Sequence, residues 1–520
     1  MKKIPLVWHP LFFALYTVLA VIATDASLIF YQQAGRALWF APALALVVML
    51  IVQAVTKNWH RTGFLVTLGI FLVGYYGHIY RLARARLAIP WLVNHAVLFP
   101  LWALIIILLG GPWLWRHVRN ARLITQFFNV VSIVVVALPS LTAFSIITQL
   151  RRDPLTNWTR PPDSTPLTLS RQQQPDIYYI IVDGYASAGI LQEIYHFDNR
   201  ELIQYLQGRG FYVAEDSRSN YPRTYLSLAS SLNFEPLDLL EGPGKNTANW
   251  FPLHELIAHS RARAALTQAG YQFTAYSSGF FYTEVRDADR YLSSYALDLN
   301  EFEQLLLATT ALEIPADWGL LPVPSFSYNA HRQRILYQLD HIGEPSQTQQ
   351  PQFVFAHLLA PHPPFVFDAQ GKAVESNQPY TMADGYDYQG TPEEYRQSYI
   401  AQLTYINARL QTLIDRILQN ASSRGVVIIL QGDHGPRMNS IGDANERGCF
   451  YERYAILNAY YLPGAQLYAS ISPVNSFRVV FNTLFGTQLE LLRDQNYFST
   501  LQRPYQFQDV TAESQIPCSP

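Results

Sequence analysis

Five long apolar runs without charged residues dominate the first 150 residues and limit what this part of the chain can become. Each run has roughly 18 to 26 residues, which matches the ~20 residues that a helix needs to cross the ~30 Å hydrocarbon core of a bilayer. We therefore expect residues 1–150 to form a transmembrane anchor of about five helices. The runs cover residues 6–23, 37–56, 62–80, 90–115 and 123–147.

The first run could also be interpreted as a signal peptide, because Lys2 and Lys3 precede it. The four further runs favour a retained first helix. Within or near the runs, the titratable groups that transport chemistry would use are limited to His9, His78 and His95, so we expect an anchor rather than a transporter.

Charge separates the anchor from the rest of the chain. Residues 1–150 contain 11 of the 37 basic residues and one of the 39 acidic residues. The remainder of the chain therefore contains 26 basic and 38 acidic residues. This asymmetry excludes a single soluble domain, a basic nucleic-acid-binding protein and a disordered chain. An odd number of spans with the N-terminus inside would place the second half outside the cell. The positive-inside comparison, seven basic residues inside against six outside, decides little about this orientation.

The second half predicts an α/β domain. Residues 151–174 are rich in Pro, Ser, Thr and Gln, as in a linker, and residues 394–418 repeat apolar positions at helical spacing. Strands that alternate with helices favour an α/β sandwich with a mostly parallel sheet, which we expect to span residues 175–520. Continuous apolar runs predict the strands at residues 176–182, 353–359, 426–430 and 459–462.

Polar residues follow two of these strands. Asp183 comes directly after the first, and Asp433 and His434 come after the third. Because ligands of such sheets gather beyond the carboxyl ends of the strands, we expect these side chains to meet. Two carboxylates and an imidazole suit Zn²⁺ or Mn²⁺, with Mg²⁺ as a further candidate, better than Ca²⁺. Taken alone, Asp183 would serve equally well as a cap of the following turn.

A hydroxyl group suited to nucleophilic attack lies between those strands. Thr224 follows Pro222, which is typical of the first turn of a helix, so the Thr224 side chain is expected at or near a helix N-terminus, where a phosphate is favoured. Beside a metal, this hydroxyl could attack phosphorus. An N-cap role is the alternative for Thr224. Competing nucleophiles further inside the helix are Ser227, Ser230 and Ser231.

Two histidines accompany the strand at residues 353–359. His362 follows the strand between prolines, where it is well placed to contact a substrate oxygen or to protonate a leaving group. His357 falls inside the apolar run, and we interpret it as a hydrogen-bonded imidazole of the core.

The order of these motifs, namely IIVDG, a Thr about forty residues later, PHPPF and GDHG, resembles the sulfatase-like branch of the alkaline phosphatase superfamily. The membrane-anchored members, lipoteichoic acid synthase and the phosphoethanolamine transferases, are the most similar. The resemblance implies an alkaline phosphatase/sulfatase-type fold and an extracytoplasmic catalytic domain. It also implies that Thr224 becomes covalently phosphorylated and that His362 binds or protonates the substrate. One divalent metal would be bound by Asp183, Thr224, Asp433 and His434.

The sequence departs from the family pattern in three places. Asp183 stands where these transferases commonly have Glu. The formylglycine pattern of true sulfatases is missing, because Pro222 and Arg223 precede Thr224 and position 228 is Leu, so we expect no sulfate-ester hydrolysis. Residues 445–454 lack the further His of two-metal members. Arg437 and Arg453 are candidates for a positive phosphate clamp instead, and the alternative for both is a surface role.

Together these features predict a metal-dependent transferase in the cell membrane that moves a phosphoryl headgroup from a lipid donor to a glycan or lipid of the cell envelope. Two alternatives stay open: a hydrolase of phosphodiester or phosphomonoester bonds, with water as acceptor, and an inactive scaffold with the same fold. No nucleic-acid partner is expected. If the second half lies outside the cell, Cys449 and Cys518 could form one disulfide.

Overall fold

The structure is a computed structural model in which the chain forms two compact units. The helical unit consists of Met1–Asp153, Tyr295–Ala330 and Ser376–Tyr380, and the sheet unit consists of Pro154–Ser294, His331–Glu375 and Thr381–Pro520. The structure describes residues 6–24, 33–87, 89, 91–116, 121–153, 155, 158, 174–244, 247–295, 299–318, 320–321, 327–344, 349–374, 380, 388–443 and 446–518. Most of the predicted linker at residues 151–174 therefore lies outside the described residues.

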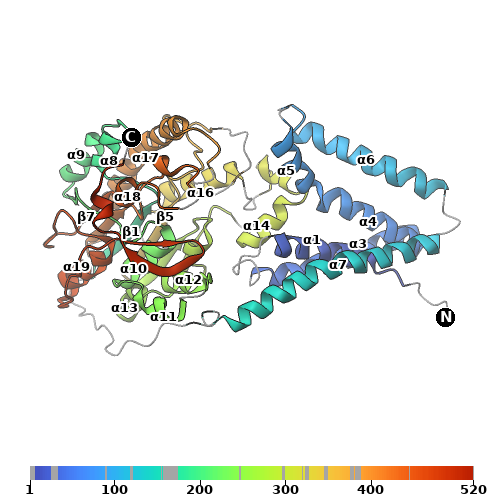
Figure 1. Cartoon of the computed structure of the whole chain (residues 1–520), viewed down its shortest axis with the longest axis horizontal. Helices are drawn as coiled ribbons and strands as arrows, with labels where there is room; N and C mark the ends of the chain where they lie inside the picture. The colour runs from blue at the N-terminus through green and yellow to red at the C-terminus, as the bar shows by residue number, and fades with distance from the viewer. Residues whose placement is uncertain are drawn as a thin grey trace. The chain divides into compact units, whose positions relative to one another are not determined.

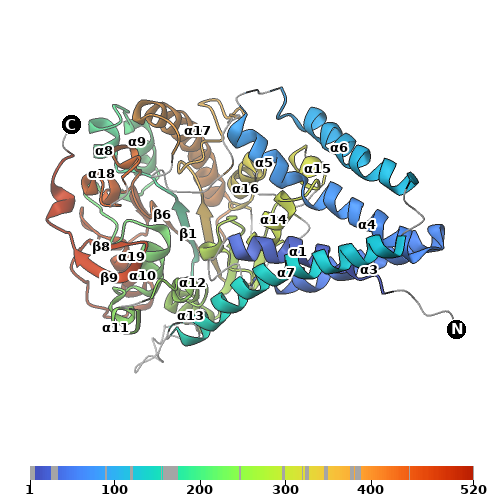
Figure 2. The same cartoon turned by 45° about the vertical axis from the view of Figure 1, so that its right-hand side comes forward.

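The helical unit contains the predicted apolar runs and two segments from the second half of the chain. The run predicted at residues 62–80 is divided at Tyr75 into two helices, and the Asn58 side chain caps the first by accepting from the N–H groups of His60 and Arg61. The helices of this unit are α1 (His9–Thr24), α3 (Gly35–Thr56), α4 (Trp59–Gly74), α5 (Tyr76–Arg86), α6 (His95–Arg116), α7 (Ala121–Arg152), α14 (Glu301–Ala308) and α15 (Glu313–Asp317) (Figure 2).

Among the described residues, three helical stretches are long and apolar enough to cross a membrane: Gly35–Thr56, Trp59–Arg84 and Ala121–Gln149. These stretches identify the chain as a membrane protein. Two shorter apolar helices, His9–Ala23 and His95–Leu108, cover the first and fourth predicted runs. The count of about five spans stays a prediction.

The sheet unit is built on a mixed, mostly parallel sheet. Strand β1 (Asp176–Val182) lies in the middle and pairs in parallel with β5 (Gln352–Leu358) and β6 (Val426–Gln431). Beyond β5 the order continues with β3 (Gln272–Tyr276) and β4 (Arg290–Leu292), also parallel. Beyond β6, β7 (Asn458–Tyr461) and β2 (Tyr212–Val213) pair in antiparallel fashion. The predicted α/β sandwich with a mostly parallel sheet is confirmed.

Helices cover both faces of this sheet (Figure 1). Strand β1 is buried along its whole length, which explains its unbroken apolar sequence. Ile177, Tyr179 and Ile181 of β1 pack into a core with residues of α10 (Thr224–Asn233), α12 (Phe251–Ala258), α13 (Arg261–Gln268) and α19 (Pro473–Phe485). The opposite face is covered by α16 (Tyr328–His341) and α17 (Pro392–Gln419). The remaining short elements are α8 (Ala188–Glu193), α9 (Arg200–Gly208), α11 (Glu241–Gly244), α18 (Phe450–Tyr454) and a hairpin of β8 (Tyr497–Thr500) with β9 (Arg503–Asp509).

Helix α17 shows how local sequence sets an element. The Thr391 side chain accepts from the N–H of Glu394, whose carboxylate accepts in return from the N–H of Thr391. Pro392 occupies the first turn, where its missing N–H costs nothing. The apolar positions at helical spacing are buried, as the prediction of a helix at residues 394–418 requires.

A disulfide joins the C-terminal tail to the segment before α18. Cys449 and Cys518, the two cysteines of the chain, form this bond with their Cα atoms 5.5 Å apart, as the sequence had suggested. Because the bond closes a long loop, it restricts the unfolded chain.

We predict that a Cys449→Ser/Cys518→Ser double variant unfolds more easily than the native protein, by about 2–4 kcal/mol, because the loop-closure constraint is lost. Thermal unfolding of both proteins in the same detergent measures this. Thiol titration of the denatured native protein before and after reduction is the control. Equal titres would show that the bond is not formed and would contradict the prediction.

Candidate metal centre

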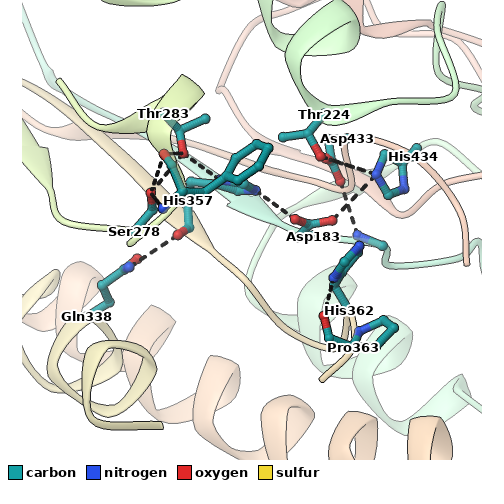
Figure 3. Close-up of polar contacts among 12 residues, drawn as sticks. Asp183, Thr224, Ser278, Thr283, Gln338, His357, His362, Pro363, Asp433 and His434 are labelled. Carbon is teal, nitrogen blue, oxygen red and sulfur yellow. Dashed lines mark hydrogen bonds and ion pairs between the residues drawn. The ribbon is translucent and has the colours of Figure 1, made fainter. Parts of the chain in front are cut away.

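Three polar side chains meet at the carboxyl edge of the sheet. Asp183 follows β1, and Asp433 and His434 follow β6 (Figure 3). The two strands end together because they run in parallel, with Ile181 opposite Gln431. The His434 Nε2 atom lies 3.6 Å from Asp183 Oδ1 and 3.5 Å from Asp433 Oδ2, and all three residues are buried. The structure therefore brings together the residues that the sequence pattern had paired.

Thr224 joins this group from α10, of which it is the first residue. Its Oγ1 atom lies 3.2 Å from His434 Nε2. The first N–H groups of a helix have no intrahelical acceptor, so the end of α10 beside Thr224 favours a negatively charged group. The competing hydroxyls of Ser230 and Ser231 are engaged elsewhere, with the carbonyl of Glu235 and the hydroxyl of Tyr179.

His362 approaches the same edge from the loop after β5. Its backbone N–H donates to the carbonyl of Asp183 at 3.1 Å, and its ring centroid lies 6.0 Å from that of His434. Its Nδ1 atom hydrogen-bonds to the carbonyl of Pro363 (Figure 3). Ligand atoms of Asp183, His362 and His434 all lie within 4.8 Å of one another.

His357 is a residue of this site that the sequence analysis did not assign to it. It is fully buried, as expected of a core imidazole, but its Nε2 atom faces Asp183 Oδ2 at 3.2 Å. Its Nδ1 atom lies 2.9 Å from Thr283 Oγ1 (Figure 3). The signal that could have found it is strand register, because His357 stands opposite Ile181, two residues before Asp183.

The donor atoms of the site fit a divalent metal. Asp183 Oδ1, Asp433 Oδ2 and His357 Nε2 are buried and have no hydrogen-bond partner within the described part of the chain. His357 Nε2 lies 3.2 Å from Asp183 Oδ2 without forming an aligned hydrogen bond. Such atoms are costly to bury unless a cation or proton compensates them. Ligand atoms of Asp183, His357 and Asp433 also lie within 4.8 Å of one another. Carboxylate oxygen and imidazole nitrogen suit Zn²⁺ or Mn²⁺.

Arg453 ties together the two loops that carry Thr224 and His434. Its Nε donates to the carbonyl of Pro222 and its Nη1 to the carbonyl of Gly435, both at 2.8 Å. The Arg453 side chain is buried, so water does not reach these carbonyls to replace the hydrogen bonds of the guanidinium. Arg453 therefore acts as a positioning residue for the site. Arg437 is also buried, and the predicted contact of both arginines with substrate stays a prediction.

The buried Glu452 carboxylate orders the loop that follows His434. It accepts hydrogen bonds from the N–H groups of Met438 and Asn439, at 2.9 and 3.0 Å, and from the hydroxyl of Tyr195 at 2.5 Å. Burial raises the pKa of Glu452 above its usual value. On the other side of the site, Arg223, which directly precedes Thr224, forms a buried ion pair with Glu446.

Comparisons with known proteins place this site in context. Residues 175–470 match the family model described as Sulfatase. No curated protein sequence matches the chain. Among solved structures, the chain is similar to the zinc complex of the C-terminal periplasmic domain of EptC from Escherichia coli, with 11% identity, a TM-score of 0.42, and coverage of 66% of this chain and 96% of that one. It is also similar to the integral membrane lipooligosaccharide phosphoethanolamine transferase A from Neisseria meningitidis. The identity is 12%, the TM-score is 0.39, and the match covers 92% of this chain and 95% of that one.

We predict that His357→Gln weakens binding of Zn²⁺ or Mn²⁺ by about 10- to 100-fold, because a nitrogen that faces Asp183 is lost. Isothermal titration of the purified full chain with each metal measures this. His254→Gln, which alters a histidine of α12 outside both candidate ligand groups, is the matched control. Unchanged metal affinity in His357→Gln would show that His357 has a purely structural role.

We also predict that Arg453→Lys disturbs the site as much as Arg453→Met does, because an ammonium group cannot span two carbonyls as a guanidinium does. Both variants should lose about 1–3 kcal/mol of stability, the cost of an unsatisfied buried acceptor, and should bind metal more weakly. Thermal unfolding and metal titration test this. A Lys variant with native metal affinity would show that Arg453 contributes charge rather than position.

Proposed function

Because the chain belongs to the sulfatase family, we propose that this sulfatase-like enzyme is a membrane-bound, metal-dependent transferase that moves a phosphoryl headgroup from a lipid donor to a cell-envelope acceptor. The observation that carries the proposal is the position of the Thr224 hydroxyl. It lies at the N-terminus of α10, 3.2 Å from His434 and on the edge of the sheet that holds Asp183 and Asp433. A nucleophile, a helix end that favours phosphate and a set of metal ligands thus occupy one place.

In this proposal one divalent ion is held by Asp183, Thr224, Asp433 and His434, and His357 is a further candidate ligand. Zn²⁺ or Mn²⁺ suits these donors, and Mg²⁺ is a further candidate. Such an ion lowers the pKa of an alcohol and offsets the negative charge of phosphoryl oxygens. The unpartnered oxygens of Asp183 and Asp433 support the assignment.

The chemistry proceeds in two displacements at phosphorus. In the first, Thr224 Oγ1 gives its proton to solvent water and forms a bond to phosphorus, while the bond from phosphorus to the donor's diacylglycerol oxygen breaks. That oxygen takes a proton from His362. In the second, a hydroxyl of the acceptor gives its proton to His362 and attacks phosphorus, the bond to Thr224 Oγ1 breaks, and Oγ1 takes a proton from solvent water. Arg437 and Arg453 are the candidates for neutralising phosphoryl charge.

The helical unit and the disulfide support a lipid donor and an extracytoplasmic site. A hydrolase of soluble substrates could be tethered by one span, whereas three described stretches can cross the membrane. The Cys449–Cys518 bond is typical of an oxidising compartment. The acceptor is proposed to be a glycan or lipid of the cell envelope, and nucleic acid is not among the proposed partners.

The proposal predicts a phosphorus-containing adduct on Thr224. The full chain in detergent is incubated with Mn²⁺ or Zn²⁺ and a total bacterial lipid extract. Intact-protein and peptide mass spectrometry then locate the adduct and give the mass of the headgroup. Thr224→Ala and Asp433→Asn should abolish the adduct, because the first removes the nucleophile and the second removes a charged ligand. Thr224→Ser should retain it, because the hydroxyl is kept.

Lipid products separate the alternatives. Release of diacylglycerol together with free phosphorylated headgroup would identify a hydrolase, whereas diacylglycerol with a headgroup-modified glycan or lipid would identify the transferase. Absence of adduct, of diacylglycerol and of bound metal would support the inactive scaffold. Such a result would overturn the proposed function.

A further inference from the structure

The longer of two segments from the second half of the chain that belong to the helical unit is residues 295–330. It runs in sequence from just after β4 into the first turn of α16, yet it forms one compact unit with the apolar N-terminal helices. The segment contains α14 and α15. Its contacts with the N-terminal helices show where along those helices it lies.

Helix α14 packs where three N-terminal helices begin or end. Phe302 is fully buried in a cluster with Val18 and Ile22 of α1 and Ala143 of α7. Glu303 accepts two hydrogen bonds from Arg36, at the start of α3, at 2.9 and 2.6 Å. Together these contacts fix α14 against the C-terminal half of α1 and the first turn of α3.

Helix α15 is fixed at the junction of α4 and α5. The N–H of Ala311 donates to the carbonyl of Val73 at 2.7 Å, and the N–H of Gly77 donates to the carbonyl of Thr309 at 3.0 Å. The approach is so close that a Cβ atom at Gly77 would lie 2.1 Å from the carbonyl oxygen of Ala308. A third link joins His95 Nε2 to Asp317 Oδ2 at 3.4 Å.

The α4–α5 junction lies inside the apolar stretch Trp59–Arg84, and the charges of this stretch gather at its ends. Helix α4 is free of charge after Arg61, whereas α5 carries Arg81, Arg84 and Arg86. Arginines next to a span are typical of the level of the lipid headgroups. Gly77 and Val73 lie four and eight residues before Arg81, so their contacts place the segment that leads into α15 within about two helical turns of the headgroup level.

Around α15, some apolar side chains face the helical unit and others are exposed. Ile314 and Ala316 are buried, and Ile314 packs with Tyr76, Tyr80 and Leu98. Leu312, Trp318 and Leu320 are 48%, 56% and 69% exposed. We call these three residues the interfacial face. An exposed Trp next to leucines is typical of elements that lie in a membrane interface.

We propose that the interfacial face inserts into the acyl–headgroup boundary of the membrane that the N-terminal helices span, so that the second half of the chain has a lipid contact of its own. A lipid surface, rather than a second copy of the chain, is favoured because exposed apolar side chains also occur on α5, which packs beside α15 in the same unit. Leu82, at 59%, and Trp91, at 68%, are exposed on the neighbouring α5 and the turn after it. The proposal is independent of the chemistry assigned to Thr224.

Single introduced cysteines test the proposal in the full chain. Both native cysteines are held in the disulfide, so a nitroxide reagent labels only Leu312→Cys or Leu320→Cys. The labelled proteins are reconstituted into vesicles of phosphatidylcholine and phosphatidylglycerol. Power-saturation electron paramagnetic resonance then compares collisions of the label with oxygen, which concentrates in lipid, and with a water-soluble nickel chelate. We expect a several-fold excess of oxygen accessibility over nickel accessibility at both positions.

Two matched positions calibrate this measurement. Val134→Cys, 64% exposed on the apolar helix α7, should give the lipid-facing ratio. Leu491→Cys, 41% exposed in the sheet unit, should give the aqueous ratio. Labels at residues 312 and 320 that match Leu491→Cys would overturn the proposal, because the face would then lie in water. Protection from both reagents would also overturn it, because a protein surface would then cover the face.

Discussion

The site depends on one electrostatic constraint, namely that two carboxylates are buried at the ends of adjacent parallel strands. Asp183 and Asp433 are almost inaccessible to water, and one oxygen of each lacks a hydrogen-bond partner within the described residues. Like charges in such a place repel each other unless positive charge or N–H groups compensate them. The chain supplies the N–H of Gly184 to Asp433 at 3.1 Å and, nearby, the N-terminus of α10 and the imidazoles of His357 and His434. A cation would complete this compensation, in agreement with the ligand atoms that lie within 4.8 Å of one another.

The backbone around Asp433 is packed so closely that only glycine fits on either side of the Asp433–His434 pair. A Cβ atom at Gly432 would lie 2.6 Å from the carbonyl oxygen of Tyr185, and one at Gly435 would lie 2.0 Å from that of Glu452. These contacts press the loop after β6 against the segments before α8 and within α18. The ligand positions are thus set by backbone packing, which is a stiffer support than a chain of side chains.

The central strands and most of the site could be predicted because both have recognisable local sequence patterns. Strands β1 and β6 are unbroken apolar runs, and Asp183, Asp433 and His434 follow them directly. Strand direction leaves no such signal, so the antiparallel pairing of β7 was not predicted, nor were the shorter β3 and β4. His357 was missed because an imidazole in an apolar strand has the same sequence pattern whether it supports the core or faces a ligand. The partners of Arg453 were equally hidden, because Pro222 is separated from it by 231 residues.

The long-range tie made by Arg453 has a consequence for catalysis. Thr224 and His434 are 210 residues apart in sequence, and they come from different elements, the start of a helix and the loop after a strand. A guanidinium that donates to the carbonyls of Pro222 and Gly435 fixes the two loops to each other before any substrate arrives. The proposed nucleophile, Thr224, would then not have to be reorganised in the transition state, and such preorganisation is the main source of electrostatic catalysis. The arginine that the sequence suggested as a contact for phosphate thus fixes the loop before Thr224 to the loop that carries His434.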